Sequence, residues 1–157
     1  MSQLPPLQGK LKYDIEYKVP VEKIHEFWRS SFGHIPKLSP NIVQNVELVE
    51  GRWGNEGCTH NWTYNIDGKV STSVLITEEV DCKKKYISFK VIGGDLLEPY
   101  YKSFKFVVQF TPKDDGGSMG SWILVYEKLN ENVPDPISMR EKSVQINKDI
   151  DAYLTQA

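Results

Sequence analysis

Polar and apolar residues alternate almost without exception over residues 10–19. Leu11, Tyr13 and Ile15 fall on one face of this segment, and charged residues occupy the positions between them. A period of two residues is typical of a β-strand with one buried face. Pro20 ends the pattern, because proline lacks the N–H group that a strand needs. The segment is therefore predicted to be a half-buried strand.

Two short helical pieces are predicted after this strand. Residues 21–29 show the apolar spacing of a helix. Gly33 and Pro36 then interrupt the chain, and a second short helix with Ile35 and Leu38 on its apolar side follows.

The middle of the chain has the pattern of successive strands. Asp67-Gly68 lies between two extended runs, which is a strong hairpin signal because both residues accept a positive φ. Similar turn residues separate the other runs, and no helical segment lies between them, so the strands are predicted to pair antiparallel. The predicted strands cover residues 42–50, 58–66, 69–80, 85–92, 101–111 and 121–128.

The last part of the chain is predicted to be one long helix. Asp135 can cap it and Pro136 suits its first turn, and no proline follows. At a helical period, one stripe contains Met139, Ser143, Ile146, Ile150 and Tyr153, with Asn147 and Leu154 beside it.

These elements together predict an α+β fold. A seven-stranded antiparallel sheet must bury one face, and the long C-terminal helix is its natural cover. We expect a curved sheet wrapped around this helix, with the two short helices at its side and a hollow between sheet and helix. Residues 9–157 are expected to form a single domain, and residues 1–8 a loose N-terminal tail.

Composition agrees with one globular domain. The chain has 157 residues, of which 39% are hydrophobic and 25% charged, and these fractions are those of a globular rather than a disordered chain. The 19 basic and 21 acidic residues give a net charge of −2, which provides no basis for nucleic-acid binding. No apolar run reaches the roughly 18 residues of a membrane span.

The two cysteines and the N-terminus indicate the compartment. The first residues lack the basic start and hydrophobic stretch of a secretion signal. Cys58 and Cys82 are therefore expected to be free thiols. We expect a cytoplasmic monomer that needs no cofactor.

Eight short sequence segments, in order along nearly the whole chain, carry a resemblance to a known family. They are Gly9-Lys-Leu11, His34-Ile-Pro-Lys-Leu-Ser-Pro40, Glu50-Gly-Arg-Trp-Gly-Asn-Glu-Gly57, Trp62-Thr-Tyr-Asn-Ile-Asp-Gly-Lys69, Gly94-Asp95, Tyr101-Lys-Ser-Phe-Lys105, Tyr126-Glu-Lys-Leu-Asn-Glu131 and Lys148-Asp-Ile-Asp-Ala152. Together they resemble the plant major latex protein branch of the birch pollen allergen superfamily. The resemblance implies a helix-grip fold, a plant origin and a large internal cavity for apolar or amphipathic metabolites. In that superfamily some relatives are binders or carriers, and others catalyse cyclisation, condensation or isomerisation.

Three other kinds of site have little basis in the sequence. Gly51, Gly54 and Gly57 have the spacing of a phosphate loop, but they lead into a strand rather than a helix and no Lys-Ser/Thr pair follows. The three histidines are far apart and show no metal-binding spacing. No Gly-x-Ser-x-Gly nucleophile motif is present.

The inner face of the predicted sheet is rich in aromatic residues, since alternation places them on one side of each strand. The residues alone favour a packed core, whereas the resemblance favours a ligand cavity. The predicted ligand-binding residues are Ile35, Leu38, His60, Trp62, Tyr64, Ile87, Phe89, Lys102, Phe104, Phe106, Trp122, Leu124, Tyr126, Met139, Ser143 and Asn147.

Four of these residues are candidates for acid–base chemistry. His60 and Lys102 fall on faces that otherwise point inward, and Tyr64 and Tyr126 bring hydroxyl groups to the same faces. The alternatives are a hydrogen-bonded core histidine and a lysine that extends to solvent from the end of a strand. Ser143 lies in the buried stripe of the last helix, where relatives are usually apolar, which suggests a polar or oxygenated ligand.

Two functions follow from these expectations. The first is a plant protein that binds a small terpenoid, alkaloid, sterol or phenolic in an internal cavity. The alternative is a cofactor-independent cyclase or isomerase that uses the same cavity and the four acid–base candidates. A hormone receptor is a third class, but the loop motifs of the receptor branch are absent.

Overall fold

The computed structural model describes residues 7–156. It contains seven strands, namely β1 (Gln8–Tyr17), β2 (Val43–Glu50), β3 (Thr59–Ile66), β4 (Lys69–Asp81), β5 (Tyr86–Gly94), β6 (Tyr101–Pro112) and β7 (Ser118–Lys128). The helical segments are α1 (Val21–Glu26), the π-helical turn η1 (Phe27–Ser31), the 3₁₀ turn η2 (Phe32–His34), α2 (Ile35–Leu38) and α3 (Ile137–Gln156). The expected α+β helix-grip fold is confirmed.

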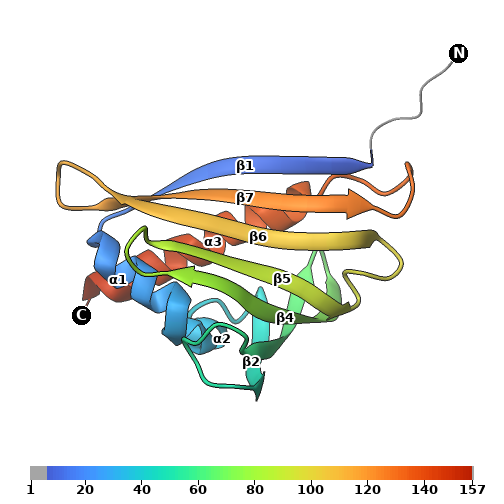
Figure 1. The fold of residues 1–157 in the computed structure, drawn as a ribbon, viewed down its shortest axis with the longest axis horizontal. Coiled ribbons are helices and arrows are strands. Elements are labelled where there is room, and N and C mark those ends of the chain that lie inside the picture. Colours follow the sequence, from blue (N-terminus) through green and yellow to red (C-terminus); the bar gives the residue numbers. More distant parts are fainter. Residues whose placement is uncertain (1–6, 157) are drawn as a thin grey trace, which may run out of the picture.

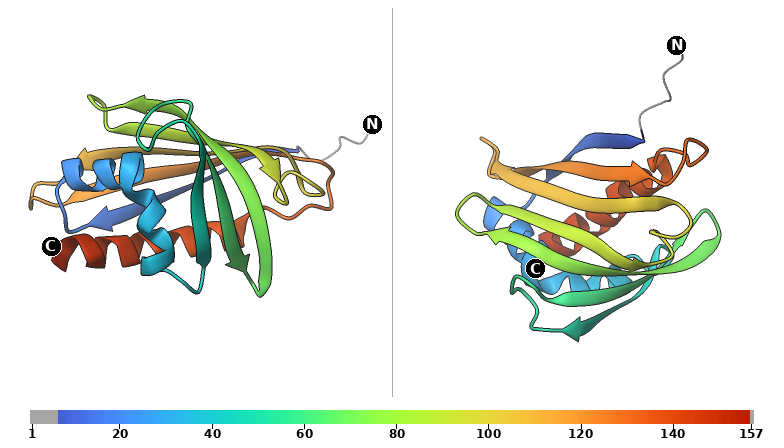
Figure 2. Two further views of the ribbon diagram at one scale, coloured as in Figure 1. Left: turned by 90° about the horizontal axis from the view of Figure 1, so that it is seen from below. Right: turned by 45° about the vertical axis from the view of Figure 1, so that its right-hand side comes forward.

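The strands form one antiparallel sheet in the order β1-β7-β6-β5-β4-β3-β2. Strands β2 to β7 therefore pair with their neighbours in sequence, and β1 is added to β7 at the edge. The sheet is strongly curved, and α3 runs along its concave face (Figure 1). Figure 2 shows α1 and α2 packed at one end of the sheet, close to the C-terminal part of α3.

The core lies between the concave face of the sheet and the helices. Alternation decides which residues of β1 enter it, since Ile15 and Tyr17 are buried while Glu16 between them is exposed. Phe104 of β6 and Leu124 of β7 are buried on the same face, and Ile150 of α3 is buried opposite the sheet. The sheet and α3 thus share one continuous hydrophobic core.

The end of α3 departs from the predicted buried stripe. Tyr153 is 44% exposed, because the last turns of α3 lie beside α1 at a groove that contains Lys23 and Phe27 rather than over the sheet.

The N-terminal tail was predicted to cover residues 1–8. Positions 1–6 lie outside the described residues, and Gln8 already belongs to β1. Among the described helices, none has the length and hydropathy needed to cross a membrane.

The glycine-rich segment before β3 is a structural loop. Gly51, Gly54 and Gly57 all have φ between +83° and +93°, which glycine adopts without the steric cost that a Cβ would add. The Arg29 guanidinium of η1 donates a hydrogen bond of 3.0 Å to the carbonyl oxygen of Gly54. The loop is thereby attached to the short helices, and a strand follows it.

Candidate functional site

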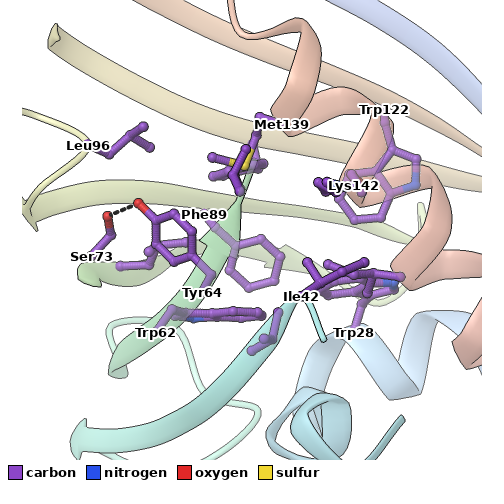
Figure 3. A pocket seen from close by; sticks show the side chains of 16 residues that line it. Trp28, Ile42, Trp62, Tyr64, Ser73, Phe89, Leu96, Trp122, Met139 and Lys142 are labelled. Atoms are coloured by element: carbon purple, nitrogen blue, oxygen red, sulfur yellow. Dashed lines mark hydrogen bonds between the residues drawn. The ribbon is translucent and has the colours of Figure 1, made fainter. Parts of the chain in front are cut away.

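A cavity of about 90 Å³ lies between the concave face of the sheet and the first half of α3 (Figure 3). Aromatic and aliphatic side chains provide almost all of its surface. The lining residues are Trp28, Ile42, Val43, Trp62, Tyr64, Ile66, Ser73, Leu75, Phe89, Leu96, Phe106, Trp122, Met139, Lys142, Ser143 and Ile146.

The two periodicities of the chain build the cavity walls. On β3, every second residue from Trp62 to Ile66 faces inward, as the strand pattern requires. On α3, Met139, Ser143 and Ile146 face the cavity because residues three and four positions apart share one side of a helix. One wall is therefore a sheet surface and the other a helix surface.

The size of the cavity sets what it can hold without rearrangement. A water molecule needs roughly 10–15 Å³ of such space, and the cavity offers about 90 Å³. An apolar lining offers water few hydrogen-bond partners, and such a space favours an apolar occupant. The cavity thus fits a compact apolar group better than a cluster of waters.

Tyr64 brings a polar group to this lining. Its hydroxyl lies 2.8 Å from Ser73 Oγ on the adjacent strand, and both residues line the cavity. Burial raises the pKa of the Tyr64 phenol, and the hydrogen bond with Ser73 partly opposes that increase. The protonated hydroxyl can donate to either Ser73 or a ligand oxygen.

His60 lies behind the cavity wall rather than in it. Trp62 Nε1 donates to His60 Nδ1 at 2.7 Å, so the proton of the neutral ring lies on Nε2, which faces Thr77 Oγ1 at 3.1 Å. The Cys58 thiol also donates to Thr77 Oγ1, at 3.3 Å. Burial lowers the pKa of His60 to about 4. The ring is therefore a neutral, hydrogen-bonded support of Trp62.

His60 should make stability depend on pH. Its pKa rises from about 4 in the folded chain to 6.5 when unfolding exposes the ring, so the unfolded state binds more protons between these values. We expect the free energy of unfolding to fall by about 2 kcal/mol from this residue between roughly pH 7 and pH 5. Urea unfolding of the wild type and of His60→Gln across this range measures the difference.

His34 provides the matched control, because it is exposed. The same substitution there, His34→Gln, should leave the pH dependence unchanged. If His60→Gln shows the same pH dependence as the wild type, the ring is not a buried neutral histidine.

The predicted inward position of Lys102 is wrong. A β-bulge between Tyr101 and Ser103 shifts the register of β6 against β7. The bulge adds one residue to β6, so the residues before it lie on the opposite face of the sheet from the one that simple alternation predicts. Tyr101 is consequently buried, while the Lys102 side chain is 70% exposed with its Nζ 3.5 Å from Glu127 Oε2. Lys102 points away from the cavity.

Tyr126 does face inward, but its hydroxyl is committed elsewhere. It donates to Asp135 Oδ1 at 2.7 Å, and Lys128 Nζ lies 2.9 Å from the same oxygen. Burial, followed by the nearby Asp135 carboxylate, raises the pKa of the Tyr126 phenol. This cluster anchors the segment before α3 and does not line the cavity.

Asn147 is fully buried and joins α3 to the rest of the core. Its Oδ1 accepts from the Tyr17 hydroxyl at 2.7 Å and from Trp28 Nε1 at 3.0 Å. Its Nδ2 donates to the carbonyl oxygen of Ser143 at 2.8 Å. Trp122 Nε1 in turn donates to the Tyr17 hydroxyl at 3.1 Å. Asn147 is therefore a structural residue under the cavity, with its hydrogen bonds used inside the protein.

Of the predicted ligand-binding residues, some line the cavity and others lie behind it. Those that line it are Trp62, Tyr64, Phe89, Phe106, Trp122, Met139 and Ser143. Those that belong to the surrounding core or surface are Ile35, Leu38, His60, Ile87, Lys102, Phe104, Leu124, Tyr126 and Asn147. Of the four acid–base candidates, only Tyr64 lines the cavity, so the structure does not bring the four together around one space.

Several lining residues were not in the predicted set. Ser73 and Leu75 lie on the inward face of β4, and the alternation of that strand contains the signal that would find them. Trp28 lies on the apolar side of the first helical segment. Leu96 lies in the loop after β5, where no periodicity indicates which side chains point inward. Over residues 7–156, no group of three histidine, cysteine or acidic side chains is arranged to hold a metal ion.

Comparison with known proteins places these features in a family. The model of the pathogenesis-related protein Bet v 1 family matches residues 6–157. MLP-like protein 43 of Arabidopsis thaliana is 39% identical over 98% of each chain, and major latex protein 149 of Papaver somniferum is 33% identical over 94% of this chain and 92% of its own. The crystal structure of ginseng major latex-like protein 151 from Panax ginseng superposes with a TM-score of 0.88, at 33% identity, over 94% of this chain and 97% of its own.

Proposed function

The chain belongs to the pathogenesis-related protein Bet v 1 family, and we propose that it binds a small, largely apolar plant metabolite in the cavity under α3. Family members bind small molecules. The observation that carries the proposal for this chain is an internal space lined almost entirely by apolar and aromatic side chains. A terpenoid, alkaloid, sterol or phenolic would have the required apolar body.

Aromatic side chains supply most of the binding energy in this proposal. Trp28, Trp62 and Trp122 line the space together with Phe89, and transfer of a CH₂ group from water into such surroundings contributes about 0.8 kcal/mol. The hydroxyls of Tyr64 and Ser143 would orient any oxygen that the ligand carries. The site has the composition of typical small-molecule pockets, in which a few polar groups fix orientation within an apolar lining.

Binding has more support than catalysis. A general acid or base must come within hydrogen-bond distance of the reacting group, and His60, Lys102 and Tyr126 do not line the cavity. Tyr64 is the remaining candidate from the cyclase or isomerase hypothesis. If Tyr64→Phe changed the products formed from a reactive precursor, the enzymatic alternative would gain its first direct support.

Filling the cavity tests the binding proposal. Ile146 faces the cavity from α3, and Ile146→Phe adds an aromatic ring to a space of about 90 Å³. We expect the affinity for apolar ligands to fall by at least about tenfold, because ligand and ring compete for the same volume. Titration of a panel of plant terpenoids and phenolics, followed by tryptophan fluorescence, measures the change.

Ile92 offers the same substitution outside the cavity, since its side chain is 46% exposed. Ile92→Phe should bind the panel as the wild type does, and melting curves show whether both variants remain folded. If no panel member binds the wild type, or if folded Ile146→Phe binds as tightly as the wild type, the ligand does not occupy this cavity.

A further inference from the structure

Lys142 is the one charged residue that lines the cavity over residues 7–156. It lies on α3 one turn after Met139 and one turn before Ile146, so the periodicity of the helix places it at the cavity. Figure 3 shows Lys142 on the α3 side of the cavity, near Met139 and Trp122. A lysine at this position is unexpected in a lining that is otherwise apolar or hydroxyl-bearing.

The side chain of Lys142 combines an apolar stem with a charged end. Its side chain is half-buried, and the surface inside the cavity is almost wholly apolar. This position allows the methylene groups to contribute to the wall and the ammonium group to extend to the rim, the usual arrangement of a long cationic side chain on apolar surface. A ligand that fills the cavity would end close to this ammonium group.

The charge of Lys142 has no partner within the described part of the chain. No hydrogen bond or ion pair of at most 4.0 Å joins its ammonium group to residues 7–156, whereas Lys102, Lys105, Lys113 and Lys128 all have acidic partners. Glu141, the acidic neighbour of Lys142 in sequence, is exposed and forms no ion pair with it within residues 7–156. Asp135 pairs with Lys128, and Asp149 accepts hydrogen bonds from Ser39 and Gln145.

Arg140 adds a second positive charge to the same end of α3. It is half-buried and close enough to Tyr13 for its charge to oppose the rise in the pKa of that phenol caused by burial. Arg140 also forms no ion pair within residues 7–156. The first half of α3 thus presents two cations beside an apolar space, with the exposed Glu141 between them in sequence but outside the cavity lining, and a negatively charged group at the cavity would be attracted to Lys142.

From this arrangement, and resting on the proposed function, we propose that Lys142 selects amphipathic ligands that carry a carboxylate. The apolar body of the ligand occupies the cavity, and the carboxylate at its end accepts a charge-assisted hydrogen bond from the Lys142 ammonium at the rim. A neutral ligand of the same shape fills the cavity but leaves this group unpaired. The chain would therefore prefer an acid over the corresponding alcohol.

Two matched probes separate the contribution of the charge from that of the apolar body. Decanoic acid and 1-decanol have the same number of carbon atoms, and the acid is ionised at about pH 7.5. Each is titrated into the full-length wild type, Lys142→Met and Lys142→Arg, with tryptophan fluorescence as the signal. Lys148→Met is the control, because Lys148 is exposed on the same helix and does not line the cavity.

We expect Lys142→Met to weaken decanoate binding about tenfold, a value between those of an exposed ion pair and a buried charge-assisted hydrogen bond. Its affinity for decanol should remain within about twofold of the wild type, since methionine preserves the apolar stem. Lys142→Arg should retain most of the preference for the acid. The control should bind both probes as the wild type does. Added salt should reduce the preference for decanoate over decanol in the wild type. In Lys142→Met, added salt should leave the ratio of the two affinities unchanged.

Each contrary result has a distinct meaning. Equal loss of both probes in Lys142→Met would overturn the proposal in favour of a packing role. Unchanged binding of both probes would overturn it while leaving cavity binding intact. Failure of both probes to bind the wild type, together with failure of the terpenoid and phenolic panel, would overturn the proposed function and this inference with it.

Discussion

Replacing Phe32 by alanine should reduce the free energy of unfolding by about 3–5 kcal/mol, the range for removal of a buried phenylalanine. The Phe32 ring is fully buried and stacks on Trp62 with a centroid distance of 5.8 Å and an interplanar angle of 7°. Its edges contact His60 at 4.7 Å and Phe89 at 5.6 Å between centroids. Chemical denaturation of the wild type and the variant measures the loss.

The same substitution should also impair ligand binding, because Phe32 supports two residues of the cavity wall. Trp62 and Phe89 line the cavity, and the Phe32 ring packs behind both. Phe32→Leu retains much of the volume and should cost less than half as much stability. If alanine at this position costs under about 1 kcal/mol, the aromatic cluster is not the support that its geometry indicates.

Asn147→Ala should cost about 3 kcal/mol of stability. The substitution leaves the Tyr17 hydroxyl and Trp28 Nε1 without their acceptor in a buried position, and an unpaired buried polar group costs roughly 1–3 kcal/mol. Thermal and urea unfolding measure the total effect.

Two further variants separate the hydrogen bonds of Asn147 from its packing. Asn147→Leu has a similar volume but no acceptor, so it should be nearly as destabilising as alanine. Lys148→Ala changes the exposed neighbour on α3 and should alter stability by at most about 0.5 kcal/mol. If Asn147→Leu is as stable as the wild type, the hydrogen bonds to Tyr17 and Trp28 contribute little net energy.

The sequence was sufficient to predict the elements of the fold, because strong periodicities and turn residues mark them. The strand predicted over residues 69–80 occupies Lys69–Asp81, and the Asp67-Gly68 turn joins it to β3, with φ of 54° and 85° at the two residues. The boundaries of the final helix also agree, since Asp135 and Pro136 precede its start at Ile137. Patterns that repeat along the chain report local structure reliably.

The candidate site was harder to predict, because its composition depends on single irregularities. One bulge in β6 turns Lys102 outward, and alternation contains no information about an inserted residue. His60 has the inward side that alternation predicts, yet Trp62 and Thr77 engage both of its nitrogens. Whether a buried polar group faces a ligand or another side chain is decided by tertiary contacts that no local pattern encodes.

The position of β1 at the sheet edge has a consequence for how the chain is made. Residues Gln8 to Tyr17 pair with Glu127 to Ser118 in β7, so the first strand finds its neighbour only after more than a hundred further residues have been synthesised. Strands β2 to β7 can pair in turn as successive hairpins emerge from the ribosome, while β1 must wait for β7, and α3 is made only after β7. Such long-range pairing is slow to form. Met139, Ser143 and Ile146 of α3 form one wall of the cavity, and Tyr13 and Tyr17 of β1 hydrogen-bond to Ser143 and Asn147 of α3. A nascent chain therefore cannot hold a ligand in this cavity until α3 has packed against the sheet.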